Sequence, residues 1–232
     1  MSANINETEV NKFSSRAEEW WKNDGDFKTL HEINPVRLAY IESRINIPAK
    51  SVLDIGCGGG ILSEAMAAKN AIVTGIDAGQ KNIDCANQHA ATNGLSIDYQ
   101  CITAEEFAQK HQSQFDLITC MELLEHVPNP ESLISACAKM IKPGGHVIFS
   151  TINRHPKSYL FAILAAEYVL NLLPKGTHDY QQFIRPAELA AWCHTTGLTV
   201  KDIQGMQYNP FLNQCNLSEK PDVNYLMDSV LD

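Results

Sequence analysis

Three side chains that could hold a metal ion or move a proton lie close together in the sequence: Glu122, Glu125 and His126. Their i, i+3, i+4 spacing predicts that all three lie on one face of a helical turn. Two carboxylates and an imidazole could hold Mg²⁺ or another divalent ion. Alternatively, His126 could act as a general base, because the unperturbed pKa of histidine is about 6.5. It could not easily do both, since a metal occupies the lone pair that a base needs. A solvated acidic turn without chemistry is the third interpretation.

A glycine-rich loop, DIGCGGG at residues 54–60, follows a short apolar run. Gly56 and Gly58 would let the backbone approach a ligand closely. The dinucleotide fingerprint needs a glycine at position 61, where this chain has Ile61. Asp54 would repel a pyrophosphate but attract the ammonium and sulfonium charges of S-adenosylmethionine. The spacing therefore favours S-adenosylmethionine as the cofactor, with a nicotinamide-dependent oxidoreductase or a purely structural turn as alternatives.

Further candidates for cofactor binding follow the next apolar runs. Asp77 ends the second run and could accept hydrogen bonds from ribose hydroxyls, or it could cap the next helix. Ala104 and Glu105, at the end of the third run, are expected beside an adenine ring. Met121, after the fourth run, could pack on the adenine or on the sulfonium-bearing tail, or simply belong to the core.

The elements that must position these residues alternate in type along the chain. Short apolar runs alternate with helical stretches of 10–15 residues, which predicts an α/β fold with a parallel sheet. The expected strands are 51–56, 71–77, 97–102, 115–120, 146–152, 198–204 and 223–230. We expect one domain over 1–232, with a helical N-terminal cap at 1–47 and an insertion at 153–185. Asn34 and Pro35 are a typical helix start, and predict where the second cap helix begins.

Net charge limits the kinds of partner that the chain can bind, and the cysteine pattern indicates its cellular compartment. The chain has 27 acidic against 18 basic residues, a net charge of −9, which argues against a nucleic acid partner. Its seven cysteines are odd in number and lack C-x-x-C spacing, which is typical of a reducing compartment. The N-terminus has no basic and apolar leader, so we expect a cytoplasmic protein.

Several motifs together resemble a known family. They are DIGCGGG, TCMELLEHVPNP, KPGG and PKGTHDYQQFIRPAEL, with the Trp20–Trp21 pair and INPVR near the N-terminus. The chain resembles the class I methyltransferases, and specifically the O-methyltransferases of ubiquinone biosynthesis. The glycine loop is shared by many methyltransferases, whereas the tryptophan pair and the PKGTHD segment are more specific.

The resemblance implies a doubly wound, Rossmann-like, mostly parallel seven-stranded sheet with helices on both faces. It implies O-methylation of polyprenylated phenol and quinol substrates at two steps of the pathway. Family cofactor contacts fall here on Arg37, Gly56, Asp77 and Met121, and the family's metal pattern falls on Glu122, Glu125 and His126. Arg37 could clamp the cofactor's carboxylate, or be a surface arginine. A methyltransferase for another small aromatic molecule and a non-catalytic module that assembles with other ubiquinone-pathway enzymes are the alternatives.

The apolar segment 159–173, YLFAILAAEYVLNLL, bears on membrane contact. It is too short to span a bilayer, which takes about 20 residues. Basic residues flank it, so it could lie in an anionic membrane surface and line the route of an isoprenoid tail. A core helix is the alternative. We expect peripheral association with the inner face of the membrane.

Overall fold

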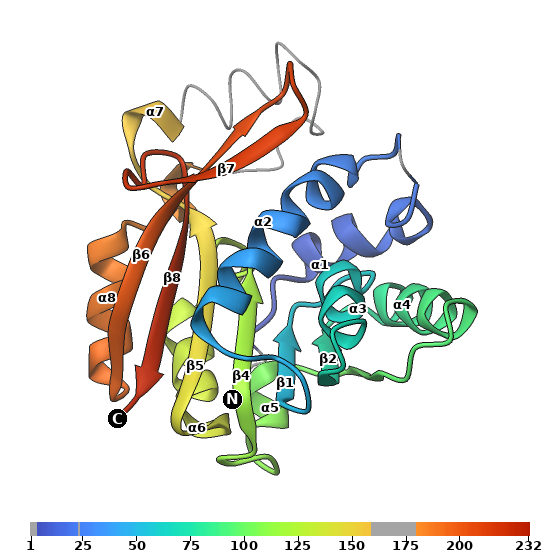
Figure 1. Ribbon diagram of the computed structural model, residues 1–232, viewed down its shortest axis with the longest axis horizontal. Coiled ribbons are helices and arrows are strands. Elements are labelled where there is room, and N and C mark those ends of the chain that lie inside the picture. The colour runs from blue at the N-terminus through green and yellow to red at the C-terminus, as the bar shows by residue number, and fades with distance from the viewer. Residues whose placement is uncertain (1–3, 23, 159–179) are drawn as a thin grey trace.

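The computed structural model describes residues 4–22, 24–158 and 180–232, which form a twisted sheet with helices on both faces (Figure 1). The strand order is β3-β2-β1-β4-β5-β8-β6-β7. The strands are β1 (Ser51–Ile55), β2 (Ile72–Asp77), β3 (Asp98–Cys101), β4 (Phe115–Met121), β5 (Ile141–Ile152), β6 (Leu198–Asn209), β7 (Gln214–Ser218) and β8 (Asn224–Leu231). Strands β3, β2, β1, β4 and β5 pair in parallel, and β8, β6 and β7 extend the sheet antiparallel. The expected doubly wound, mostly parallel class is confirmed.

The sheet has an eighth strand that the sequence pattern does not reveal. We expected β6 to end at residue 204, but it runs to Asn209, and β7 returns antiparallel to it from Gln214. The run 214–218, QCNLS, does alternate polar and apolar residues, but with five residues and only two apolar side chains it is too short to predict a strand from periodicity alone. The KPGG segment, which we expect to form a turn, lies inside β5. The pairing of β5 with β4 shifts register there, between Phe115 and Leu117.

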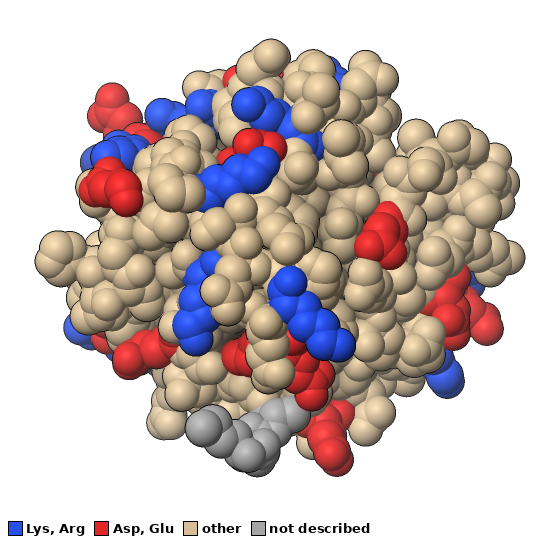
Figure 2. Space-filling view, turned by 90° about the horizontal axis from the view of Figure 1, so that it is seen from below, with Lys and Arg blue, Asp and Glu red and all other residues tan. Residues whose placement is uncertain are grey.

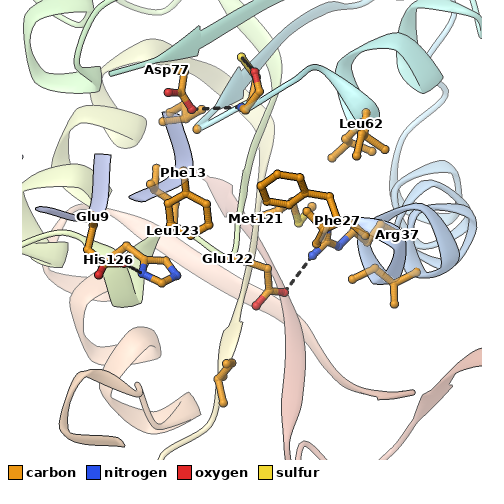
Figure 3. Close-up of a pocket in the computed structure, with 18 of the residues that line it drawn as sticks. Glu9, Phe13, Phe27, Arg37, Leu62, Asp77, Met121, Glu122, Leu123 and His126 are labelled. Atoms are coloured by element: carbon orange, nitrogen blue, oxygen red, sulfur yellow. Dashed lines mark hydrogen bonds and ion pairs between the residues drawn. The ribbon is translucent and has the colours of Figure 1, made fainter. Parts of the chain in front are cut away.

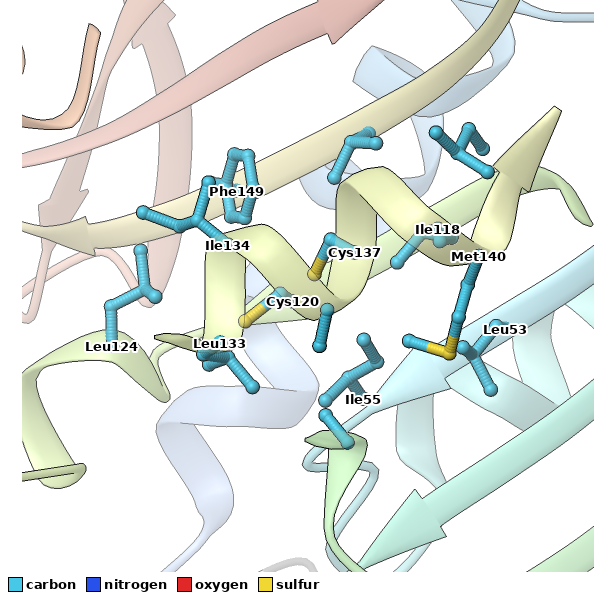
Figure 4. Packing of buried hydrophobic residues seen from close by; sticks show 14 of the residues in the cluster. Leu53, Ile55, Ile118, Cys120, Leu124, Leu133, Ile134, Cys137, Met140 and Phe149 are labelled. Carbon is cyan, nitrogen blue, oxygen red and sulfur yellow. The ribbon is translucent and has the colours of Figure 1, made fainter. Parts of the chain in front are cut away.

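The helices cover the two faces of the sheet. One face carries α2 (Lys28–Arg44), α3 (Ile61–Ala67) and α4 (Gln80–Thr92); the other carries α5 (Ala104–Phe107), α6 (Pro130–Met140) and α8 (Pro186–Thr195). Successive strand residues point to opposite faces. Leu53 therefore packs beside Met140 of α6 (Figure 4), whereas Val52 packs in the cluster that contains Tyr40 of α2.

The N-terminal cap consists of α1 (Glu7–Ser14), η1 (Ala17–Glu19) and α2. The prediction that the second helix begins at Asn34 and Pro35 is wrong, because α2 begins at Lys28 and continues through Pro35. A proline inside a helix removes one backbone hydrogen bond and costs about 3 kcal/mol. Tertiary contacts offset this cost: Ile41 of α2 is fully buried, and the Asn34 side chain donates a hydrogen bond to the Ile61 carbonyl at 3.2 Å.

The apolar segment 159–173 and most of the expected insertion lie outside the described residues. Of that insertion, the structure describes α7 (Pro156–Ser158) and η4 (Tyr180–Gln182). Within the described ranges, no helix has the length and apolarity that crossing a membrane requires.

Charged side chains of both signs are interspersed on the face that Figure 2 presents, which is the lower face of Figure 1. Lys and Arg lie among Asp and Glu there, so the acidic excess of the chain is not gathered into one region of this face.

Candidate active site

A cavity of about 1230 Å³ opens where the parallel strands end (Figure 3). Its walls include the ends of β1, β2 and β4, the start of α5, the N-terminal cap and the β6 segment from Met206 to Asn209. The chain order of the sheet reverses between β1 and β4, and ligands of doubly wound folds bind at this point. Since a pocket for one drug-sized ligand measures roughly 300–1,000 Å³, this cavity can hold a cofactor and a second molecule together.

The glycine loop is packed directly beneath the N-terminal cap. Gly56 and Gly58 have φ of +70° and +53°. A Cβ added at Gly58 would lie 2.4 Å from the ring of Trp20, so no larger residue fits beneath the indole. Trp20 stacks on Phe27, with ring centroids 3.8 Å apart, and Trp21 donates its indole N–H to the Gly59 carbonyl at 2.8 Å. The cap therefore fixes the conformation of the loop.

Asp77 lies at the end of β2 and joins the loop to the next helix. Its Oδ2 accepts a hydrogen bond from the Gly58 N–H at 3.1 Å, and its Oδ1 accepts from the Gly79 N–H at 2.7 Å and from Asn82 at 3.1 Å. Burial raises the pKa of Asp77, and these three hydrogen bonds oppose the shift. The residue that caps the N-terminus of α4 is Gly79, so Asp77 is not the N-cap of the next helix. Asp77 thus lies on the cavity wall with a fixed carboxylate.

Asp54 is buried and held by two hydroxyl groups. Ser63 Oγ donates to its Oδ2 at 2.6 Å, and Thr119 Oγ1 donates to its Oδ1 at 2.7 Å. Burial raises the pKa of Asp54, whereas the two hydrogen bonds lower it. The carboxylate also lines the cavity, so one group ties β1, α3 and β4 together and faces the ligand space.

Ala104 and Glu105 form the first turn of α5 and line the same cavity. Glu105 Oε1 accepts a hydrogen bond from Asn4 Nδ2 at 2.7 Å. Asn4 also exchanges hydrogen bonds of 2.8 Å with the backbone of Asn129. The N-terminal residues therefore close over this side of the cavity, a contact across 101 positions that no local pattern in the sequence indicates.

Glu122 is held by a different set of partners from the one that we expected. Its backbone is left-handed, with φ of +50°, and it precedes the short helix η2 (Leu124–His126) instead of belonging to it. Arg37 Nη2 lies 3.1 Å from Glu122 Oε1, and Asn224 Nδ2 donates to both carboxylate oxygens at 3.1 and 3.2 Å. Ser150 Oγ is a further donor to Oε1. Met121, next to it, is half-buried and lines the cavity.

Arg37 is not a surface residue, since its exposed fraction is 5%. It projects from α2 onto the cavity wall beside Glu122 (Figure 3). Among the described residues, no acceptor lies within hydrogen-bond distance of its buried Nε. A guanidinium that uses one arm on Glu122 retains a donor for an acidic ligand group.

Glu125 and His126 differ in environment although they are adjacent. Glu125 is buried, and Thr151 Oγ1 donates to its Oε2 at 2.6 Å. Burial and the charge of Glu122 raise the pKa of Glu125 to about 7.

His126 lies on the cavity wall, and its Nδ1 is 2.8 Å from Oε2 of Glu9, on α1. Burial would lower the pKa of His126, but the hydrogen bond to Glu9 and the charges of Glu125 and Glu9 outweigh it, so the pKa is raised. The sequence pattern did not identify Glu9.

The three expected metal ligands do not converge. Glu122 is paired with Arg37, Glu125 with Thr151, and His126 with Glu9. The prediction of a single helical face fails because Glu122 lies in the connection between β4, which ends at Met121, and η2, which begins at Leu124. In the part of the chain that the structure describes, no three His, Cys, Asp or Glu side chains are grouped to hold an ion. This donor set does not fit a divalent metal.

Comparison with known proteins agrees with this geometry. The family model of the methyltransferase domain matches residues 9–203. Ubiquinone biosynthesis O-methyltransferases from Pseudomonas syringae and Stutzerimonas stutzeri are 53% and 54% identical over 228 residues, which is 98% of both chains. A methyltransferase structure from Thermotoga maritima superposes with a TM-score of 0.67 at 14% identity, covering 97% of this chain and 99% of that one. Magnesium protoporphyrin IX methyltransferase from Synechocystis, solved with S-adenosylhomocysteine, gives a TM-score of 0.64 at 19% identity, covering 88% of this chain and 84% of that one.

The fold and the site define a class I, S-adenosylmethionine-dependent methyltransferase. Within that class, the chain belongs to the family of the ubiquinone biosynthesis O-methyltransferases.

Proposed function

We propose that this chain catalyses S-adenosylmethionine-dependent O-methylation in ubiquinone biosynthesis, and that it acts on the phenolic hydroxyls of polyprenylated catechol and hydroquinone intermediates at both O-methylation steps. The observation that carries the proposal is the cavity of about 1230 Å³, which joins the glycine loop and Asp77 to an ionisable segment at 122–126 and to an apolar rim. Such a cavity suits a cofactor at one end and an aromatic ring with an apolar tail at the other.

The chain's own residues fit the methyl donor. Asp77 can accept hydrogen bonds from ribose hydroxyls, Arg37 can bind the carboxylate, and Ala104 and Glu105 lie where the third strand ends. Asp54 supplies negative charge beside the loop for the ammonium and sulfonium groups. When bound, S-adenosylmethionine supplies a methyl group on a sulfonium that leaves as a neutral thioether.

The second requirement is to remove the phenolic proton. The pKa of a phenol is about 10, so at neutral pH it needs a base to become a good nucleophile. We assign that role to His126, which lines the cavity and whose Nδ1 is oriented by the carboxylate of Glu9. Glu9 acts as a positioning residue and stabilises the imidazolium that forms. The cap packs over the glycine loop, and exclusion of water from the occupied cavity would favour a reaction between a phenolate and a sulfonium.

Glu122 and Glu125 then serve the site without a metal. Glu122 positions Arg37 through their ion pair. Glu125, buried beside His126, stabilises its protonated form. Because each carboxylate already has a protein partner, the reaction needs no divalent ion in this proposal.

The substrate also determines where the protein works. A polyprenylated ring resides in the bilayer, so we propose peripheral contact with the inner face of the membrane, through anionic lipid at the basic flanks of segment 159–173. Assembly with other enzymes of the ubiquinone pathway would bring successive intermediates to one place.

The test is a methylation assay on a polyprenyl catechol and on a demethylated ubiquinol, with and without Mg²⁺. The parent should methylate both, His126→Ala should lose most turnover while still binding the cofactor, and Glu122→Gln should chiefly weaken cofactor binding. Turnover on neither substrate, with turnover on another small phenol, would refute the assignment to ubiquinone biosynthesis. Cofactor binding with no turnover on any phenol would favour a non-catalytic module.

A further inference from the structure

The tip of the β6–β7 hairpin presents apolar side chains to solvent. Among the described residues, four large hydrophobic side chains are exposed, and three of them belong to this hairpin. Phe211 is 84% exposed, Leu212 62% and Leu217 37%. Figure 1 shows the hairpin projecting beyond the ends of the neighbouring strands β5 and β8. A concentration of exposed apolar residues on one projecting element marks an interaction surface.

Hydrogen bonds fix the conformation of the hairpin tip. The Asn209 side chain accepts hydrogen bonds from the backbone N–H groups of Phe211 at 3.0 Å and Leu212 at 3.3 Å. Directly beside the tip, the Tyr208 hydroxyl donates to Glu32 of α2. The two apolar side chains are therefore presented on a turn that is ordered before any partner arrives.

The hairpin is also free of charge. No Asp, Glu, Lys, Arg or His occurs from Ile203 to Ser218, a run of 16 residues in a chain of which 19% are charged. Soluble proteins usually blunt an exposed edge strand with charged residues. An uncharged, apolar edge suits a partner that is itself apolar and extended, and the interfacial region of a bilayer has that character.

The hairpin and the cavity are continuous. Met206, Tyr208 and Phe211 line the cavity together with Leu30 and Ile33 of α2. The exposed tip thus lies at the apolar end of the same space that holds the glycine loop at its other end. An element that enters the bilayer here would bring the cavity mouth to the depth at which an isoprenoid tail is anchored.

We propose that the tip of the β6–β7 hairpin, residues 209–213, docks on the bilayer through Phe211 and Leu212, and that the substrate's tail passes between this hairpin and α2 into the cavity. The second clause rests on the proposed function, whereas the docking itself does not. Because the hairpin carries no charge, its contribution to binding should be the same on neutral and on anionic lipid.

The test is flotation with phosphatidylcholine vesicles, and with vesicles that also contain phosphatidylglycerol. The double variant Phe211→Ser, Leu212→Ser should lose on the order of tenfold or more in partition constant on both kinds of vesicle, since both side chains lose their apolar burial. The matched control is Ile72→Ser, which removes a 66% exposed side chain at the opposite end of the sheet and should leave the partition constant unchanged.

Thermal unfolding of each variant serves as the control that the variant is folded. Equal vesicle binding by the parent and the double variant would overturn the docking proposal, and so would a dimer that the double variant dissociates without any change on vesicles. Turnover on a water-soluble short-chain catechol tests the proposed function by itself. Vesicle binding requires no turnover, so the two proposals can fail separately.

Discussion

Replacing Gly58 by alanine tests how closely the N-terminal cap and the cofactor loop are packed. The new Cβ would lie 2.4 Å from one carbon and 2.6 Å from another carbon of the Trp20 ring, against an ordinary contact of about 3.5–4.0 Å. Either the loop or the indole must then move by about 1 Å. Overpacking of this kind costs about 1–3 kcal/mol, and the left-handed backbone adds about 1–2 kcal/mol. We expect Gly58→Ala to lower the free energy of unfolding by about 2–5 kcal/mol.

Gly94→Ala is the matched control. Gly94 also has a left-handed backbone, with φ of +68°, but a Cβ there meets no atom within 4 Å. This variant should lose only the backbone contribution, about 1–2 kcal/mol, and should bind S-adenosylmethionine as the parent does. Urea unfolding gives the two free energies and titration calorimetry gives the two affinities. Equal losses of stability, together with unchanged cofactor affinity in Gly58→Ala, would refute the packing of Trp20 on the loop.

Three further predictions concern the cavity. Glu9→Gln should move the acid limb of the pH–rate profile to lower pH, because Glu9 helps to raise the pKa of His126 and a base acts only when deprotonated. An acid limb that does not move would count against the pairing of Glu9 with His126. Arg37→Met should weaken S-adenosylmethionine binding on the order of tenfold or more by calorimetry, the effect of losing a charged hydrogen-bond donor, while unchanged affinity would remove Arg37 from the site. Treatment with EDTA should leave turnover unchanged, because Glu122 is already paired with Arg37; a large loss restored by Mg²⁺ would contradict our assignment of the donors.

Regular elements and their order could be predicted from the sequence because periodicity and glycine placement are local signals. The glycine loop, Asp77 and the strands of the parallel half follow from such signals, and all the predicted cofactor-binding residues line one cavity. The start of α2 was mispredicted because Asn34 and Pro35 imitate a helix N-terminus, whereas tertiary packing of the helix offsets the cost of the proline.

The residues that the sequence could not indicate are those brought in by long-range contacts. Glu9 meets His126 across 117 positions, and Asn4 meets Glu105 across 101. The shared helical face of Glu122, Glu125 and His126 was mispredicted for a different reason: the i, i+3, i+4 rule assumes a continuous helix, and the left-handed backbone of Glu122 breaks it. Glu122 therefore contacts Arg37 and Asn224 and does not share a helical face with Glu125 and His126.

The tryptophans lie where their intrinsic fluorescence can report ligand binding. The chain has three tryptophans, and two of them, Trp20 and Trp21, contact the glycine loop directly, while Trp192 lies on α8 on the opposite face of the sheet. Because indole emission responds to nearby dipoles and charges, occupation of the loop by a cationic ligand should change the intrinsic fluorescence. Binding could then be followed in real time with the unlabelled protein, and Trp192→Phe would remove the constant background signal.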